Sequence, residues 1–354
     1  MAKLDILFKK MVELGASDLH LTATNVPMWR IHGDILKDEE MPSLTPQELM
    51  ETLIEIAPKE RVDDFIQTGD LDFAYELEGT GRFRANLFMD RLGPSAVFRL
   101  IPSEIVTAED LGLSKGIIEM CKLAKGLVLV TGPTGSGKST TLSAMIDYIN
   151  RSRRNHIITI EDPIEFVHKN KSCLVNQREI TTHTESFKKA LRASLREDPD
   201  IILIGEMRDL ETTEIAIETA ETGHLVFGTL HTSTAASTVD RIIQQFPGDK
   251  QNQIKMMLSN SLKGVISQTL LKKANGNGRL AAMEVLVNTP AVSNMIREGK
   301  IHQLASTMQT SSKDGMILLN AVLEDYVKKG IVTKDEAMSK AIDKAGLASK
   351  LTLF

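Results

Sequence analysis

Cysteine is scarce in this sequence, because 354 residues contain only Cys121 and Cys173. The two lie too far apart to form a CxxC redox pair or a zinc knuckle. With neither a disulfide framework nor a secretory signal in the sequence, we expect the protein to be cytoplasmic.

Long hydrophobic runs are missing as well. No apolar stretch approaches the roughly 18 to 20 residues that a membrane-spanning helix needs. Any association with the inner face of the cytoplasmic membrane is therefore expected to go through a partner. Positive charge is not in excess either, since the formal net charge is −5. Because the overall charge does not match that of nucleic acid partners, we expect no direct nucleic-acid binding.

The chain is long for a single hydrophobic core, so two domains are expected. Residues 1–101 combine helical patterns at 3–14 and 46–56 with alternating apolar and polar stretches such as LDFAYEL, which are typical of strands. This part is predicted to be a small α+β domain. Residues 102–112 are interpreted as a linker.

Residues 113–354 have a different pattern. Four short apolar runs (GLVLVTG, HIITIED, DIILIGE and HLVFGTLH) alternate with helical segments. Continuous apolar strands separated by helices indicate an α/β domain with a parallel sheet that is covered on both faces. Beyond residue 249 the pattern is almost wholly helical, apart from a turn at NGNG (275–278).

The stretch GPTGSGKST follows one of these strands and precedes a helical segment. Glycines let the backbone approach phosphate closely, and amide N–H groups at a helix N-terminus bind the anion. A glycine-rich turn without a ligand is the alternative, but the pattern and its context favour an ATP site. Lys138 is expected to reach the β- and γ-phosphates, and the Ser139 hydroxyl to ligate Mg²⁺. The predicted phosphate loop consists of Gly132, Pro133, Thr134, Gly135, Ser136, Gly137, Lys138, Ser139 and Thr140.

Acidic residues follow two other apolar strands. In DPDIILIGEMRD, Gly205 takes the position where Asp is usual, and the carboxylate comes next as Glu206. Two roles stay open for Glu206: holding Mg²⁺ through water, or polarising the attacking water. In TIEDPIEF, the carboxylates are Glu161, Asp162 and Glu165. Because the carboxyl ends of parallel strands converge on the ligand crevice, a catalytic role is favoured over a solvated acidic turn.

A histidine ends the fourth apolar strand, in GTLHTSTAA. Taken alone, His231 would most often be a packed or surface residue. Its place at a strand end predicts instead a hydrogen bond to the γ-phosphate. Metal binding is not expected, since no HxxxH spacing occurs among the eight histidines.

The order of these motifs resembles the secretion and type IV pilus motor ATPases. GASDLHL and GRFRANLF are similar to the N-terminal domain of that family, and NMIREGKIHQL (294–304) is similar to a C-terminal segment of its twitching-motility retraction branch. The resemblance implies a PAS-like N-terminal domain and a RecA-like P-loop ATPase domain. It also implies a ring-shaped homohexamer with ATP between the two domains.

The same resemblance assigns roles to single residues. Glu165 is expected to activate water, Glu206 to belong to the Mg²⁺ site, and His231 to sense the γ-phosphate. Arginines of the N-terminal domain are expected to approach the phosphates across a subunit boundary, with Arg82, Arg84 and Arg99 as the candidates. The implied partners are the inner-membrane platform protein of the pilus and, indirectly, the pilin fibre.

The implied activity is pilus retraction. Where the family typically has AIRNLIRE, this chain has AVSNMIRE (291–298), so Ser293 replaces a basic residue. An assembly, secretion or DNA-uptake motor is the alternative, although such motors usually have a further N-terminal domain and a tetracysteine zinc element. A non-hydrolysing nucleotide-binding ring is a third interpretation. Glu165 and Glu206 argue against it, because a binding module needs no water activator.

Overall fold

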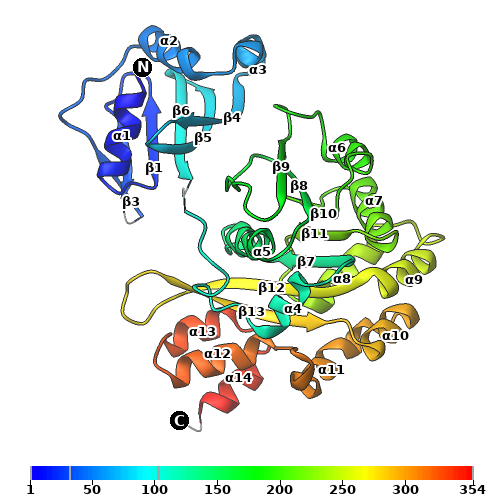
Figure 1. Ribbon diagram of the computed structural model, residues 1–354. Helices are drawn as coiled ribbons and strands as arrows, with labels where there is room; N and C mark the ends of the chain where they lie inside the picture. The colour runs from blue at the N-terminus through cyan, green and yellow to red at the C-terminus, as the bar shows by residue number, and fades with distance from the viewer. Residues whose placement is uncertain (1, 32, 102–103, 353–354) are drawn as a thin grey trace. The chain divides into compact units, whose positions relative to one another are not determined.

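The computed structural model describes residues 2–31, 33–101 and 104–352, which form two compact units (Figure 1). The first unit comprises Met1–Glu104 together with Pro163–Val167, and the second comprises Ile105–Asp162 and His168–Phe354. Residues 102 and 103 of the predicted linker lie outside the described residues. Residues 105–112, also predicted as linker, are part of the second unit.

The first unit contains a six-stranded antiparallel sheet in the order β3-β2-β1-β6-β5-β4. Its strands are β1 (Asp18–Thr22), β2 (Met28–Ile31), β3 (Asp34–Lys37), β4 (Asp70–Leu77), β5 (Gly81–Asp90) and β6 (Gly93–Ile101), and its helices are α1 (Asp5–Glu13), α2 (Pro46–Ile56) and α3 (Val62–Thr68). The apolar side chains of α1 that repeat at helical spacing, Leu7, Phe8 and Met11, are buried in the core. Helix α2 begins with a capping box between Thr45 and Glu48.

The second unit contains a seven-stranded sheet in the order β13-β12-β7-β11-β10-β8-β9. Its strands are β7 (Gly126–Thr131), β8 (His156–Glu161), β9 (Leu174–Glu179), β10 (Ile201–Ile204), β11 (Leu225–Leu230), β12 (Leu262–Lys272) and β13 (Arg279–Val287). All neighbouring pairs are parallel except β12 and β13. The predicted fold class, an α/β domain preceded by a smaller α+β domain, is confirmed.

Helices cover both faces of this sheet (Figure 1). The helices of the second unit are α4 (Lys115–Cys121), α5 (Lys138–Ser152), α6 (Phe187–Ser194), α7 (Leu210–Glu221), α8 (Ala235–Gln244), α9 (Gln251–Ser261), α10 (Pro290–Glu298), α11 (Leu304–Thr310), α12 (Leu319–Lys328), α13 (Lys334–Lys340) and α14 (Lys344–Leu351). In β7, Leu127 and Leu129 pack in the core with α6 to α11, whereas Val128 and Val130 pack with α4 and α5. This alternation explains why the strands are apolar throughout.

The prediction of an almost wholly helical region after residue 249 is wrong for β12 and β13, which form an antiparallel hairpin. Strand β12 pairs with β7 and is buried along most of its length. Residues 264–268 of β12 are buried in succession and do not alternate between apolar and polar, so periodicity does not separate this segment from a buried helix. The hairpin places β12 directly beside the strand that leads into the phosphate loop.

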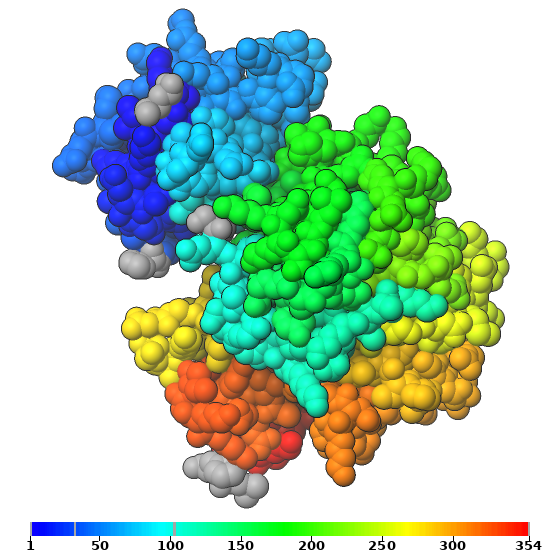
Figure 2. Space-filling model, in the orientation of Figure 1, coloured from blue at the N-terminus to red at the C-terminus, as the bar shows by residue number. Residues whose placement is uncertain are grey.

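Helices α12, α13 and α14 pack on the end of this hairpin around a small core of their own, which includes Leu271, Leu323 and Leu347. Figure 2 shows them as an orange-to-red lobe. The buried Glu284 of β13 connects this lobe to the rest of the unit. Its carboxylate accepts hydrogen bonds from the backbone N–H of Ala235, 2.9 Å away, and of Leu319, 3.4 Å away. These are the first residues of α8 and α12, so one side chain caps two helices.

Replacing Glu284 with alanine is expected to lower the free energy of unfolding by about 2 to 4 kcal/mol, because two buried N–H groups lose their acceptor. Glu284→Gln keeps the size of the side chain and one acceptor oxygen, so a smaller loss is expected. Urea-induced unfolding followed by circular dichroism measures both. A loss below about 0.5 kcal/mol for Glu284→Ala would contradict the capping role.

The difference in free energy of unfolding between the parent and Glu284→Gln is also expected to depend on pH. Burial raises the pKa of the Glu284 carboxyl above its ordinary value, although the two backbone hydrogen bonds lower it. A raised pKa means that the stability linked to this group is fully present below the ordinary pKa and is lost as the pH rises through the folded value. Glutamine does not titrate, so the stability gap between the parent and Glu284→Gln should narrow from acidic to neutral pH. A gap that widens would contradict this.

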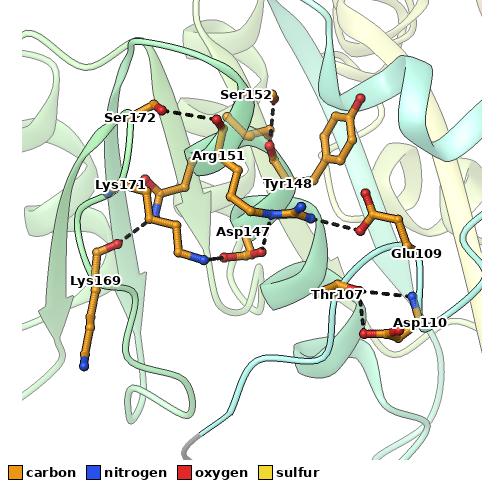
Figure 3. A network of polar contacts seen from close by, with 12 residues as sticks. Thr107, Glu109, Asp110, Asp147, Tyr148, Arg151, Ser152, Lys169, Lys171 and Ser172 are labelled. Carbon is orange, nitrogen blue, oxygen red and sulfur yellow. Dashed lines mark hydrogen bonds and ion pairs between the residues drawn. The ribbon is translucent and has the colours of Figure 1, made fainter.

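Helix α5, which follows the phosphate loop, is held by a polar network around the buried Asp147 (Figure 3). Asp147 accepts from Arg151 Nε at 2.8 Å and from Lys171 Nζ at 2.6 Å. Arg151 also donates to Glu109, with an Nη2–Oε2 distance of 2.9 Å. Three separate stretches of the second unit are thus connected, which holds α5 in place behind the loop.

Candidate functional site

The phosphate loop connects the end of β7 to the start of α5. Gly135 and Gly137 have φ angles of +76° and +87°, which favour glycine over residues with a side chain. Gly137 is also the N-cap residue that directly precedes α5, where the first backbone N–H groups of a helix have no intrahelical acceptor. The loop therefore presents backbone amides and the positive end of a helix dipole, which is a binding site for an anion.

Lys138 is the first residue of α5 and its side chain turns back over the loop. Its Nζ donates to the carbonyl oxygen of Gly132 at 2.8 Å and to that of Pro133 at 3.2 Å. The ammonium group therefore already lies at the loop. A phosphate bound by the loop would lie within reach of this cation.

The residues of the loop fit a phosphate group. The Ser136 hydroxyl oxygen is buried and has no hydrogen-bond partner among the residues that the structure describes. Gly132 has no room for a Cβ, which would lie 2.6 Å from that oxygen. Buried hydroxyls normally have partners. A phosphate oxygen would supply one, and bare glycine backbone lets it come close.

Glu206 follows β10 and is bound by two side chains. One carboxylate oxygen, Oε1, accepts from Arg208 Nε at 2.6 Å and from His231 Nε2 at 2.8 Å. Burial raises the pKa of the Glu206 carboxyl, but the hydrogen bonds from Arg208 and His231 outweigh it and hold this pKa below its ordinary value. The group is therefore a carboxylate at neutral pH.

The structure brings His231 to the phosphate loop as well as to Glu206. In the last rung of the ladder between β7 and β11, Thr131 lies opposite Leu230. The next residues along the two strands are Gly132 and His231, and the N–H of Gly132 donates to the carbonyl of Leu230 at 3.3 Å. The histidine side chain is half exposed. A carboxylate and an imidazole thus meet at the edge where the loop begins, within one unit of the chain.

The packing around position 205 favours glycine over the acidic residue that is usual there. A Cβ at this position would lie 3.2 Å from the carbonyl oxygen of Ile160 and 3.3 Å from the Cα of Glu161, at the end of the neighbouring strand β8. A side chain here would push β8 and β10 apart. The carboxylate lies on the next residue, Glu206.

The three carboxylates of TIEDPIEF are not equivalent. Glu161 Oε1 accepts from the Thr159 hydroxyl at 2.6 Å and from Gln177 Nε2 at 3.1 Å, so it is held by its own sheet. Asp162 is exposed and adds to the negative charge near Arg208. Glu165 lies in Pro163–Val167, which groups with the first unit. Its role as water activator stays a prediction.

The candidate arginines all belong to the first unit. Arg99 Nε donates to Asp18 Oδ1 at 2.8 Å. Arg82 Nη1 lies 3.6 Å from Glu76 Oε2, and Arg84 Nε lies 3.9 Å from Asp72 Oδ1. The carboxylate of Asp18 is buried, whereas those of Glu76 and Asp72 are mostly exposed. Exposed ion pairs are weak, so the pair of Arg84 with Asp72 contributes little to stability. The approach of Arg82, Arg84 or Arg99 to a phosphate stays a prediction.

Sequence reasoning missed Arg208 and Gln268. Arg208 lies in the quoted motif LIGEMRD, and the signal for it was a basic residue two positions after Glu206. Gln268 lies on β12 and contacts the loop, with its Nε2 2.7 Å from the Ser136 carbonyl oxygen. No sequence signal pointed to it, because β12 was expected to be helical.

The metal prediction rests on Ser139 and Glu206. Within the described ranges, no group of three or more His, Cys, Asp or Glu side chains is arranged to hold a metal ion. Magnesium at a nucleotide typically takes one or two protein oxygens together with phosphate oxygens and water. Ser139 on the first turn of α5 and the carboxylate of Glu206 are oxygen ligands of the kind Mg²⁺ prefers, so this donor set suits that cation.

A phosphate loop between a parallel strand and a helix, with a carboxylate at a neighbouring strand end, is the arrangement with which P-loop NTPases bind and hydrolyse nucleotides. The chain is a P-loop ATPase of this class. It belongs to the Type II/IV secretion system protein family, whose model matches residues 3–339.

The comparisons with single proteins agree with this assignment. The chain is 50% identical to the type IV pilus retractation ATPase PilT of Pseudomonas aeruginosa, over 92% of this chain and 94% of that one. It is 48% identical to a twitching motility protein of Neisseria gonorrhoeae, over 89% and 84%. The crystal structure of the pilus retraction motor PilT with bound ADP matches with a TM-score of 0.92 and 47% identity, and the match covers 99% of each chain.

Proposed function

We propose that this protein is a hexameric ATP-hydrolysing motor that powers retraction of type IV pili and so twitching motility. The observation that supports it most is the similarity to PilT along nearly the whole length of both chains. The site geometry agrees, since the loop, Glu206 and His231 meet at one edge of the sheet.

In this proposal the loop amides and Lys138 bind the phosphates of ATP, and Ser139 and Glu206 hold Mg²⁺. Mg²⁺ held there would supply positive charge against the phosphates of ATP. Glu165 or Glu206 takes the proton of the attacking water. His231, which is hydrogen-bonded to Glu206, senses whether the γ-phosphate is present.

The proposed partners follow from the similarity. Six copies of the chain form a ring, in which Arg82, Arg84 or Arg99 approaches the phosphates of a neighbouring subunit. The ring acts in the cytoplasm, at the inner face of the membrane, through a pilus platform protein and thereby on the pilin fibre. No helix within 2–31, 33–101 or 104–352 combines the length and apolar character needed to cross a bilayer.

Deletion of the gene in the source organism tests the direction of the motor. A retraction motor predicts cells that carry many pili and do not twitch, because fibres are assembled but not withdrawn. Counting surface pili and measuring twitching zones provides the readout. The parent gene should restore both, whereas Lys138→Ala should not. Cells without pili would instead indicate an assembly motor, which is the alternative function.

A further inference from the structure

Strand β12 contributes a buried polar side chain to the phosphate loop. Gln268 is 4% exposed, and its amide lies between the loop and helix α5. Nε2 donates to the backbone carbonyl of Ser136 at 2.7 Å, and Oε1 accepts from the Thr141 hydroxyl at 2.7 Å. A carbonyl oxygen only accepts, so this contact requires the NH₂ group of the amide on the side of the loop.

The same strand lies against the glycines of the loop. A Cβ at Gly137 would lie 2.8 Å from Gln268 Nε2, and a Cβ at Gly132 would lie 2.3 Å from the carbonyl oxygen of Gln268. The neighbouring Ser267 contacts Thr131, the last residue before the loop, with 2.8 Å between the hydroxyl oxygens. Residues 267 and 268 therefore fix both ends of the loop.

The contact with Ser136 determines the direction of a loop amide. In a trans peptide the C=O and the following N–H point in opposite directions. Because the Ser136 carbonyl points to Gln268, the N–H of Gly137 points away from β12. Without the Nε2 donor of Gln268 the peptide could rotate and turn its carbonyl oxygen, which repels phosphate, toward the anion.

We propose that Gln268 is a positioning residue for nucleotide binding: it holds the Ser136–Gly137 peptide so that the amide N–H faces the phosphates. The proposal rests on nucleotide binding at this loop. Thr141 keeps the Gln268 amide in the required orientation by donating to its oxygen. Gln268 itself does not touch the reacting atoms.

Three variants separate the two contacts. Gln268→Glu keeps the acceptor for Thr141 but places a carboxylate oxygen against the Ser136 carbonyl. Gln268→Met has a similar size and loses both contacts without adding charge. Thr141→Val loses only the contact with the helix. Gln253→Glu, at an exposed glutamine of α9, is the matched control for the change in charge.

Equilibrium binding of fluorescently labelled ADP is the main measurement, with thermal unfolding of the nucleotide-free protein beside it. Both Gln268 variants are expected to weaken ADP binding about 10-fold or more, through the lost donor and the turned peptide. Thr141→Val is expected to weaken it less than about 5-fold, and Gln253→Glu not at all. In ATP hydrolysis by the Gln268 variants, KM should rise while kcat stays close to the parent value. A general loss of structure would lower kcat as well.

Folded Gln268→Met that binds ADP within about 2-fold of the parent would overturn the proposal, even if Gln268→Glu does not fold. A parent protein that fails to bind ADP would overturn the nucleotide site itself, which is a different result. Weakened ADP binding together with a lowered kcat and a lowered unfolding temperature would also overturn the proposal. Such a result would indicate that Gln268 supports the structure in general.

Discussion

Glu206→Gln is expected to bind ATP with near-parental affinity and to lose most of its hydrolysis, about 10²- to 10³-fold in kcat. The change removes the negative charge that holds Mg²⁺ or accepts the proton of water, but keeps the size of the side chain. Hydrogen bonds from Arg208 and His231 hold the pKa of Glu206 below its ordinary value against the effect of burial. Glu206 is therefore ionised at neutral pH, and the substitution removes a full negative charge. Phosphate release and equilibrium binding of an ATP analogue measure the two effects separately.

Two further variants complete this experiment. Glu197→Gln removes a carboxylate that pairs with Arg178 on another part of the surface, and it should leave hydrolysis unchanged. Glu165→Gln tests the other proposed water activator in the same assays. Parental turnover in either Glu206→Gln or Glu165→Gln would remove the role assigned to that residue.

Lys138→Ala is expected to abolish both nucleotide binding and hydrolysis, with losses of about 10²-fold or more, because the cation that lies at the loop is removed. Lys122→Ala, which removes a surface lysine paired with Glu119, is the control and should behave like the parent. Fluorescent ADP binding detects the loss of affinity. Retained ADP affinity in Lys138→Ala would mean that the loop is not the phosphate site.

Mixed rings extend this experiment to the proposed arginine in trans. Arg82→Ala subunits have an intact loop, and Lys138→Ala subunits have an intact arginine. If Arg82 acts on the neighbouring subunit, mixing the two inactive variants should create some complete sites and restore part of the activity. Mixed rings without any recovery would count against action across the interface.

The sequence carried strong local signals for the second unit. The glycines and the lysine of GPTGSGKST require a tight turn before a helix, and this turn connects β7 to α5 as expected. Four apolar runs marked β7, β8, β10 and β11, because strands buried on both faces need apolar side chains throughout. The order of the motifs was sufficient to place the chain in its family.

The sequence has no comparable local signal for the hairpin of β12 and β13. Residues 264–268 in the middle of β12 are buried in succession, so this part of the sequence has no alternation that distinguishes a strand from a buried helix. Gln268 therefore had no visible function, although it contacts the phosphate loop. Arg208 stood in a recognised motif, but only the geometry showed that it binds Glu206.

The sequence by itself determined the phosphate loop, the strand ends and the family, because each depends on residues that are close together in the chain. Only the tertiary structure decided which side chains share a site. The contact between His231 and Glu206, 25 residues apart, requires β10 and β11 to pair in register. The contact between Gln268 and Ser136, 132 residues apart, requires β12 to lie beside β7. The pairing of strands that are distant in the sequence depends on the packing of the whole sheet, and a local sequence pattern does not predict it.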